Sequence, residues 1–273
     1  EEYSAATLRR KLHKCLNDFM VPLETDEIKR DSLGMKFDGL NLDDLDGVLS
    51  KLSIDRSVEP VAAFRGGASE ANRLLDTFIA DKLKDYDERR NEPVADCVSH
   101  MSPYLHFGQL SPLQIALAVD KARGKPRKAK DAYLEELIVR RELSMNFVAF
   151  NAHYDSYSSL PDWARATLKS HEKDKREYVY SGREFEKAET HDPYWNAAQR
   201  EMVKTGKMHN YMRMYWGKKI LEWSETPEKA FRTAIALNNK YELDGRDPNS
   251  FAGVAWCFGK HDRPWQERPI FGT

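Results

Sequence analysis

The sequence lacks the features of several protein classes. No stretch of its 273 residues approaches the roughly 20 uninterrupted apolar residues that a membrane-spanning helix needs, and no charged-then-apolar leader opens it. Its three cysteines, Cys15, Cys97 and Cys257, lie far apart, which argues against a disulfide framework or a zinc cluster. We therefore expect reduced thiols, an intracellular reducing compartment, no membrane and no metal.

The sequence also lacks an excess of positive or negative charge. The chain has 43 Lys and Arg against 44 Asp and Glu, a net charge of −1, which excludes a globally basic nucleic-acid binder but leaves local patches open. An initiator methionine is missing, and the sequence stops abruptly at Ile270-Phe271-Gly272-Thr273, so we expect a piece of a longer protein. The 41% hydrophobic content, with 12 Phe, 12 Tyr and 6 Trp, is that of a globular protein with a substantial core.

Strand patterns are nearly absent, whereas helical spacing of apolar residues recurs along the chain. The nearest candidate for a strand covers residues 177–181. Helices are predicted over residues 1–20, 69–86, 133–149, 207–223 and 227–237, and a further helix is predicted to start at Pro112. Two of them begin with a capping residue and a proline: Ser111 before Pro112, with Gln114 completing a capping-box arrangement, and Thr226 before Pro227.

Residues 20–60 have the composition of a connector. Between positions 24 and 55 there are nine acidic residues and four basic ones, punctuated by Gly34, Gly39 and Gly47. The sequence thus predicts an all-α domain without internal repeats, preceded by a linker.

A basic run stands out at residues 121–130, where six of ten residues are Lys or Arg and none is acidic. It can lie beside a phosphate backbone, or it can be a solvated loop between two helices; the pattern leaves both open.

Two other segments carry candidate chemistry. Residues 96–114 contain two Ser-Pro steps, and the hydroxyls of Ser99 and Ser102 beside helix starts suit a phosphate, although such residues also serve simply as caps. In residues 207–223, Trp216 and Trp223 lie about 10 Å apart along one helix face, a spacing that suits electron hopping and ordinary packing alike.

Five ordered blocks carry a resemblance to a known family. They read HMSPYLHFGQLSP at 100–112, EELIVRREL at 135–143, MHNYMRMYW at 208–216, NNKYELDGRDPN at 238–249 and CFGKHDRPW at 257–265. Together they resemble the class II cyclobutane pyrimidine dimer photolyases of the photolyase/cryptochrome family, over nearly the whole chain.

The resemblance implies a helical FAD-binding catalytic domain over residues 61–273. Residues 1–60 would be the end of the family's α/β antenna domain and the interdomain linker, with the rest of the antenna domain absent from this chain. The implied activity is light-driven repair of pyrimidine dimers in UV-damaged DNA by a monomer, in the nucleus or another DNA-containing compartment if the source is eukaryotic.

The family's cofactor site is carried over residue by residue. Asn238 is expected at flavin N5, and an Arg213–Asp244 salt bridge is expected beside the ring. Arg140 or Arg141 is expected to neutralise the phosphates, and the motif does not choose between them. The other residues expected to contact FAD are Tyr86, Ser99, Met101, Ser102 and Asn210.

The lesion site follows in the same way. Glu136 is expected to donate a hydrogen bond to the dimer, which requires burial that keeps it protonated; a pairing with an arginine on the next turn is the alternative. Met214 and Trp256 are expected to form apolar walls, with Tyr211 as a further lesion contact. Arg263 and Trp265 are expected to enter the hole left in the DNA, although Trp265 can instead anchor the C-terminal segment.

An electron chain for photoreduction is implied at Trp195, Trp216 and Trp223, with Trp216 and Trp195 nearest the flavin and Trp223 nearer solvent. Many class I enzymes have a Trp where this sequence has Val139, which favours class II and leaves one pocket wall unassigned. His100, His106 and His209 are assigned no proton-transfer role.

Two rival functions remain. One is a cryptochrome-like flavin photoreceptor without repair activity, and the other is a cofactor-free helical scaffold that binds DNA through residues 121–130.

Overall fold

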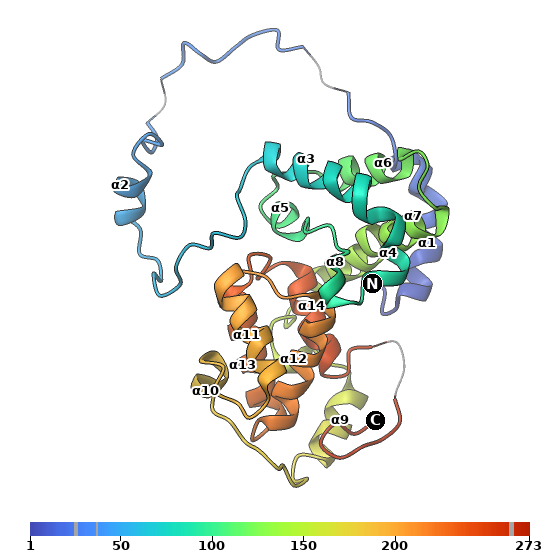
Figure 1. The fold of residues 1–273 in the computed structure, drawn as a ribbon, viewed down its shortest axis with the longest axis vertical. Helices are drawn as coiled ribbons and strands as arrows, with labels where there is room; N and C mark the ends of the chain where they lie inside the picture. Colours follow the sequence, from blue (N-terminus) through green and yellow to red (C-terminus); the bar gives the residue numbers. More distant parts are fainter. Residues whose placement is uncertain (25–26, 37, 262–264) are drawn as a thin grey trace. The chain divides into compact units, whose positions relative to one another are not determined.

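The computed structural model describes residues 1–24, 27–36, 38–261 and 265–273 (Figure 1). Two compact units divide them: one combines Glu1–Val21 with Val61–Thr273, and the other is Pro22–Pro60. Within the described residues the regular structure is helical, apart from an isolated bridge between Arg268 and Gly272. This confirms the predicted all-α class. In the part that the structure covers, no helix is both long and apolar enough to cross a membrane.

The larger unit begins with α1 and continues through a series of helices after residue 61. Its first group comprises α1 (Ala5–Phe19), α3 (Ala68–Thr77), α4 (Tyr86–Arg89), α5 (Ser102–His106), α6 (Pro112–Lys121), α7 (Arg127–Leu134) and α8 (Arg141–Phe150). Its second group comprises α9 (Asp162–Ser170), α10 (Gly182–Glu186), α11 (Pro193–Thr205), α12 (Asn210–Trp223), α13 (Pro227–Tyr241) and α14 (Pro248–Cys257). The smaller unit holds α2 (Leu45–Ser50), which begins where the Asp44 carboxylate accepts a hydrogen bond from the Gly47 amide at 2.9 Å.

The first group packs around its own apolar cluster. Phe78, Tyr86 and Tyr133 lie at its centre with ring centroids 4.7–5.8 Å apart. α1 joins this group through the Arg9 guanidinium, which binds both carboxylate oxygens of Glu135 at 2.5 and 3.0 Å. The N-terminal helix is therefore part of the larger unit.

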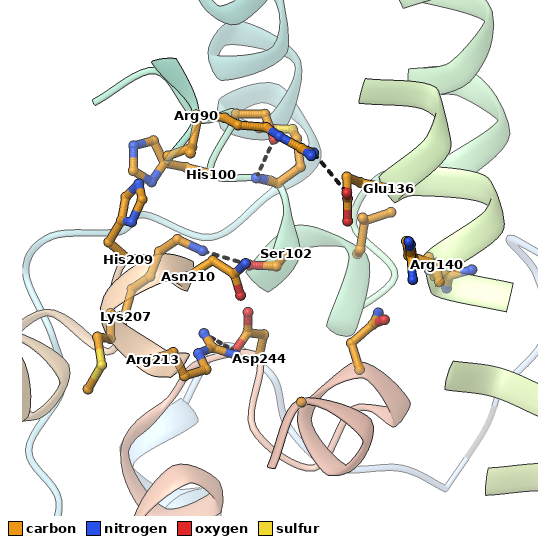
Figure 2. A pocket seen from close by; sticks show the side chains of 18 of the residues that line it. Arg90, His100, Ser102, Glu136, Arg140, Lys207, His209, Asn210, Arg213 and Asp244 are labelled. Atoms are coloured by element: carbon orange, nitrogen blue, oxygen red, sulfur yellow. Dashed lines mark hydrogen bonds and ion pairs between the residues drawn. The ribbon is translucent and has the colours of Figure 1, made fainter. Parts of the chain in front are cut away.

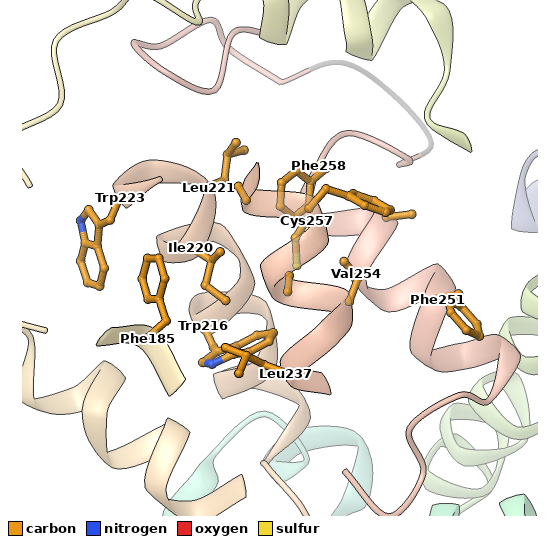
Figure 3. Packing of buried hydrophobic residues seen from close by; sticks show 14 of the residues in the cluster. Phe185, Trp216, Ile220, Leu221, Trp223, Leu237, Phe251, Val254, Cys257 and Phe258 are labelled. Carbon is orange, nitrogen blue, oxygen red and sulfur yellow. The ribbon is translucent and has the colours of Figure 1, made fainter. Parts of the chain in front are cut away.

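The second group packs around a larger cluster to which α11–α14 contribute (Figure 3). The apolar face of α12 supplies Trp216, Ile220 and Trp223, and α14 supplies Val254 and Cys257, all of them buried. α14 also packs along α8 from the first group. Burial of this many large side chains is the main stabilising term for these helices, because each contributes roughly 1.5–3 kcal/mol.

Several local predictions need correction. Ser111 caps α6 by accepting from the Leu113 amide, but Gln114 donates to Asn72 at 2.8 Å instead of completing a capping box. The helix expected over 133–149 begins earlier, with α7, and contains a π-helical turn at Glu135–Arg140. A second π-helical turn, Phe78–Lys82, and a 3-10 turn, Leu83–Asp85, interrupt the helix expected over 69–86.

The basic run at residues 121–130 lies partly in α7 and carries several internal contacts. Lys128 pairs with Asp87 at 2.8 Å, Arg127 pairs with Asp131 at 2.8 Å, and Lys125 donates to the Ala80 carbonyl at 2.6 Å. Lys125 and Lys128 are thus bound to neighbouring helical segments, whereas the Arg127 pair lies within α7; a role of the run beside a phosphate backbone stays a prediction.

Candidate functional site

A cavity of about 1170 Å³ opens within the larger unit, lined by both groups of helices (Figure 2). It exceeds the roughly 300–1,000 Å³ of most small-ligand pockets, so it is large enough for a dinucleotide. Twelve of the predicted residues line it: Tyr86, Ser99, Met101, Ser102, Glu136, Arg140, Arg141, Asn210, Arg213, Met214, Asp244 and Trp256.

One wall carries a buried ion pair. The Arg213 guanidinium, on the first turn of α12, lies 3.3 Å from the Asp244 carboxylate in the loop before α14. Burial raises the pKa of Asp244, but the charges of Arg213 and Lys207, with the Ser102 hydroxyl, lower it to about 2. A buried charge persists only when it is paired, so this wall holds a fixed dipole at neutral pH. The predicted salt bridge is formed; its contact with a flavin stays a prediction.

A corner that contains the Lys207 ammonium group lies next to this pair. Lys207 Nζ donates to the Ser102 hydroxyl at 2.7 Å, which brings the start of α12 to the start of α5 (Figure 2). His100 and His209 line the same corner, and each has one buried ring nitrogen without a hydrogen-bond partner in the described chain. Burial, and then the charge of Lys207, lower the pKa of both imidazoles, so both are neutral at pH 7.

Surrounding contacts hold the backbone of His100 in a strained conformation in this corner. Its φ of 57° lies in the left-handed region, which non-glycine residues seldom adopt. The His100 ring bonds Asp96 at 2.6 Å, and Asp96 also pairs with Lys82 at 2.7 Å. Such strain persists where surrounding contacts over-determine it, and it is frequent at ligand sites.

Glu136 lies on the opposite wall, in the π-helical turn. Its carboxylate pairs with Arg90 at 2.8 Å and its side chain is 43% exposed, so the expected burial is wrong. The alternative, a partner on the next turn, is wrong too, because Arg90 comes from the end of α4. To bind a lesion, Glu136 would have to exchange Arg90 for it.

Both candidate phosphate arginines line the cavity, so the structure does not choose between them. Arg140 lies 3.6 Å from Glu135, and Arg141 lies 3.7 Å from Glu142.

Asn238 and Tyr211 are not brought to the cavity. Asn238 is 1% exposed near the end of α13 and its amide nitrogen bonds the Ser250 hydroxyl, while its Oδ1 has no partner among the residues described. Tyr211 is 58% exposed on the first turn of α12. Neither lines the cavity, so their expected direct contacts are not seen.

Trp265 is one of the two C-terminal residues that are expected to enter the hole left in the DNA. Trp265 is 65% exposed and its ring lies 6.3 Å from that of His261, which in turn lies 6.0 Å from Trp256. Arg263 lies outside the described residues.

The three tryptophans of the expected electron chain form a buried contact series. Trp195 on α11 lies between the other two, with its ring centroid 6.4 Å from Trp216 and 6.2 Å from Trp223. The Trp195 indole donates to the Trp216 carbonyl at 3.1 Å, and the Trp216 indole donates to Gln199 at 2.8 Å. None of the three lines the cavity, and Trp223, at 4% exposed, is buried like the others.

The side chain of Met214, in the apolar wall that it forms with Trp256, packs against the thiol of Cys257. The Cys257 thiol lies 4.0 Å from the Met214 sulfur, and a side-chain carbon on Gly217 would come within 2.7 Å of that thiol. Glycine at 217 therefore permits α14 to approach α12 closely. Burial raises the pKa of Cys257 to about 12, so the thiol is neutral and acts as a packing group.

Sequence reasoning missed four residues of the site: Lys207, Arg90, Tyr133 and Glu242. Lys207 stands directly before the MHNY block, so its position was a usable signal. Arg90 and Tyr133 reach the cavity through tertiary packing that no local pattern reveals. Glu242 lies inside the NNKYELDGRDPN block, two residues before Asp244, but the resemblance assigns no role to it.

Comparisons with known proteins find relatives that match over nearly the whole of this chain. No protein-family model matches the chain. Its sequence is 55% identical over 272 residues to the deoxyribodipyrimidine photo-lyase of Methanothermobacter thermautotrophicus, covering 100% of this chain and 59% of that protein. It is 45% identical over 279 residues to that of Arabidopsis thaliana, covering 99% of this chain and 56% of the relative. The chain thus spans somewhat over half the length of these relatives.

Among solved structures, a bacterial class III photolyase from Agrobacterium tumefaciens has the same fold. It superposes with a TM-score of 0.59 at 23% identity, over 71% of this chain and 38% of its own.

Proposed function

Because this chain belongs to the photolyase/cryptochrome family, we propose that the protein containing it is a class II photolyase that repairs cyclobutane pyrimidine dimers in DNA under near-UV or blue light. The observation that carries the proposal is a dinucleotide-sized cavity with a buried Arg213–Asp244 pair on one wall and Met214 and Trp256 on another. Val139 in place of the class I tryptophan supports the class assignment. The α/β antenna domain is proposed to lie in the further length that the relatives possess.

The cavity fits FAD in the chemistry of its donors. Lys207, Ser99 and Ser102, with Arg140 and Arg141, supply cations and hydroxyls for a diphosphate. Buried polar atoms that have no partner in the described chain, such as Arg213 Nε and His209 Nε2, need a hydrogen-bonding ligand. Reduced FAD, when bound, supplies a light-excited electron to the dimer and recovers it after the ring splits.

The protein's own residues orient the reactants and exclude water. Arg213 and Asp244 hold a fixed dipole beside the cavity, which needs no reorganisation when charge moves. Met214 and Trp256 offer an apolar face to a swung-out pyrimidine pair and recover part of the few kcal/mol lost on unstacking. Glu136, once released from Arg90 and closed off from solvent by a bound lesion, would take up a proton and donate a hydrogen bond to the pyrimidine carbonyls.

Photoreduction of the resting cofactor is proposed to use the tryptophan series. Trp216 lies on α12, three residues after Arg213, and the contacts of Trp195 with both other indoles provide a continuous path of aromatic rings toward Trp223. His191 and Lys219 contact the Trp223 ring at 4.8 and 5.2 Å, on the side that leads to the surface.

The test is dimer repair by the full-length protein under blue light, with a dark control. We expect loss of dimers only in the light. Repair in the dark, or no repair by protein carrying fully reduced FAD, would contradict the proposal. Photoreduction without repair would identify the photoreceptor alternative.

A further inference from the structure

Glu242 is a buried acid that the proposed repair chemistry does not use. It follows α13, and its side chain is fully buried, at 0% exposed. Its backbone is fixed on both sides: the Glu242 amide donates to the Asn238 carbonyl at 3.0 Å, and the Leu243 amide donates to the Gly206 carbonyl at 2.7 Å. The backbone that carries this side chain is therefore held in place where α13 ends.

The Glu242 carboxylate lies against Arg213. Its Oε2 is 3.1 Å from Arg213 Nη2, the same nitrogen that lies 3.3 Å from Asp244. One buried cation thus stands between two buried carboxylates. With both acids ionised, two buried carboxylates share a single guanidinium, which is costly.

The hydrogen bonds of Glu242 are incomplete. Neither carboxylate oxygen has a partner of normal hydrogen-bond geometry among the described residues, whereas Asp244 accepts one from Arg213. The two acids are therefore unequal: Asp244 is held as the anion, and Glu242 is the one whose charge is poorly compensated.

We propose that Glu242 is a positioning residue that acts through Arg213: by gaining or losing a proton, it sets how much of the Arg213 charge is free to act on the cavity. When Glu242 is ionised, Arg213 is shared between two carboxylates. When Glu242 takes a proton from solvent, Arg213 pairs with Asp244 alone, and the cluster becomes neutral.

The charged groups that face Glu242 fit this role. Burial, and then the charge of Asp244, raise the pKa of Glu242. The charges of Arg213 on α12 and of Lys207, with the Met208 amide, lower it, and the net result is a pKa of about 7. Cys257 on α14, the remaining titratable group near Arg213, stays a neutral thiol.

The inference rests on the proposed function in one respect: an anionic ligand group next to Arg213, such as a reduced flavin ring, favours the protonated acid. Ligand binding at Arg213 and proton uptake at Glu242 are then coupled. By linkage, affinity for such a ligand falls as pH rises through the titration of Glu242.

The test is infrared spectroscopy of the full-length protein freed of cofactor, titrated between pH 5 and 9. We expect the carbonyl band of a protonated carboxylic acid to lose half its intensity near pH 7 and to be missing from Glu242→Gln. The control is Glu225→Gln, an equal charge change at an exposed acid paired with Lys229, which should leave the band intact. No titrating band in the wild type, or an unchanged band in Glu242→Gln, would overturn the proposal.

A further variant covers failure of Glu242→Gln to fold. Glu201 lines the same cavity, and desolvation also raises its pKa, so it is the other acid that could give a titrating band. Glu201→Gln should keep the band if the band belongs to Glu242. Loss of the band in Glu201→Gln would assign it to Glu201 and refute the proposal. A second arm measures the affinity for fully reduced FAD under anaerobic conditions at pH 6 and pH 8, where raising the pH should weaken binding by the wild type relative to Glu242→Gln. If the protein binds no FAD, the proposed function fails while the infrared result still decides the role of Glu242.

Discussion

Replacing Asp244 by asparagine removes the better-compensated anion beside Arg213 and should destabilise the protein even without cofactor. The pKa of Asp244 falls from 3.8 to about 2 on folding. At roughly 1.4 kcal/mol for each pKa unit, the ionised carboxylate contributes on the order of 2 kcal/mol. Part of this loss is recovered because Glu242 remains 3.1 Å from Arg213 and ionises more readily once Asp244 is neutral. We therefore expect Asp244→Asn to lower the free energy of unfolding by roughly 1–2 kcal/mol at pH 7.

The sign of the pH dependence makes this prediction specific. A carboxylate whose pKa is lowered by folding stabilises fully above its unfolded pKa, so the difference between variant and wild type should shrink as pH falls from about 4 toward about 2. It should also narrow as pH rises from about 5 to about 7, because Glu242 ionises at lower pH in the variant than in the wild type, and it should be constant above that range. Urea unfolding of the cofactor-free protein measures it. The control is Asp131→Asn, which removes an exposed partner of Arg127 and should cost under about 0.5 kcal/mol. Equal effects of the two variants, or a difference that grows below pH 4, would refute the reasoning.

Three further predictions concern other parts of the site. Gly206→Ala should lower the free energy of unfolding, measured in urea, by about 2 kcal/mol, because Gly206 has φ of 71° and an added carbon would lie 2.6 Å from Leu243. The control is Gly124→Ala, at φ of 69° in open space, which should cost clearly less. Equal losses in the two variants would show that the contact with Leu243 does not matter. Trp216→Phe should abolish photoreduction and leave repair by chemically reduced enzyme intact, and an unchanged photoreduction rate would remove Trp216 from the path. Glu136→Ala should lower the repair yield per absorbed photon with little loss of flavin, and an equal yield would leave Glu136 as only a partner of Arg90.

The helical architecture follows from the sequence because amphipathic spacing and cap residues are local signals. Thr226 caps α13 through the Lys229 amide as the Thr-Pro pattern predicts. The π-helical turn at Glu135–Arg140 has no such signal, and it decides where Glu136 and the two arginines point.

A contact within the site could be predicted from the sequence where two buried residues of opposite charge must neutralise each other. Arg213 and Asp244 must pair because neither charge is tolerated alone in the interior, and they do. Glu136 and Arg90 lie 46 positions apart and meet only because α4 packs on α7 beside the π-helical turn, so residue pattern alone could not give this contact. Asn238 shows the opposite case, since a motif match does not reveal that its amide turns to Ser250.

The most direct test of the central claim is equilibrium binding of FAD to the cofactor-free, full-length protein, followed by flavin fluorescence. Lys207 contributes the cation that contacts Ser102, and Lys204, three residues earlier on α11, is exposed and does not line the cavity. Saturable binding of one FAD per chain, weakened about tenfold or more by Lys207→Ala and unchanged by Lys204→Ala, is the predicted result, since a charge-assisted hydrogen bond contributes roughly 1.5–3 kcal/mol. Binding that does not saturate, or that both variants weaken equally, would contradict it.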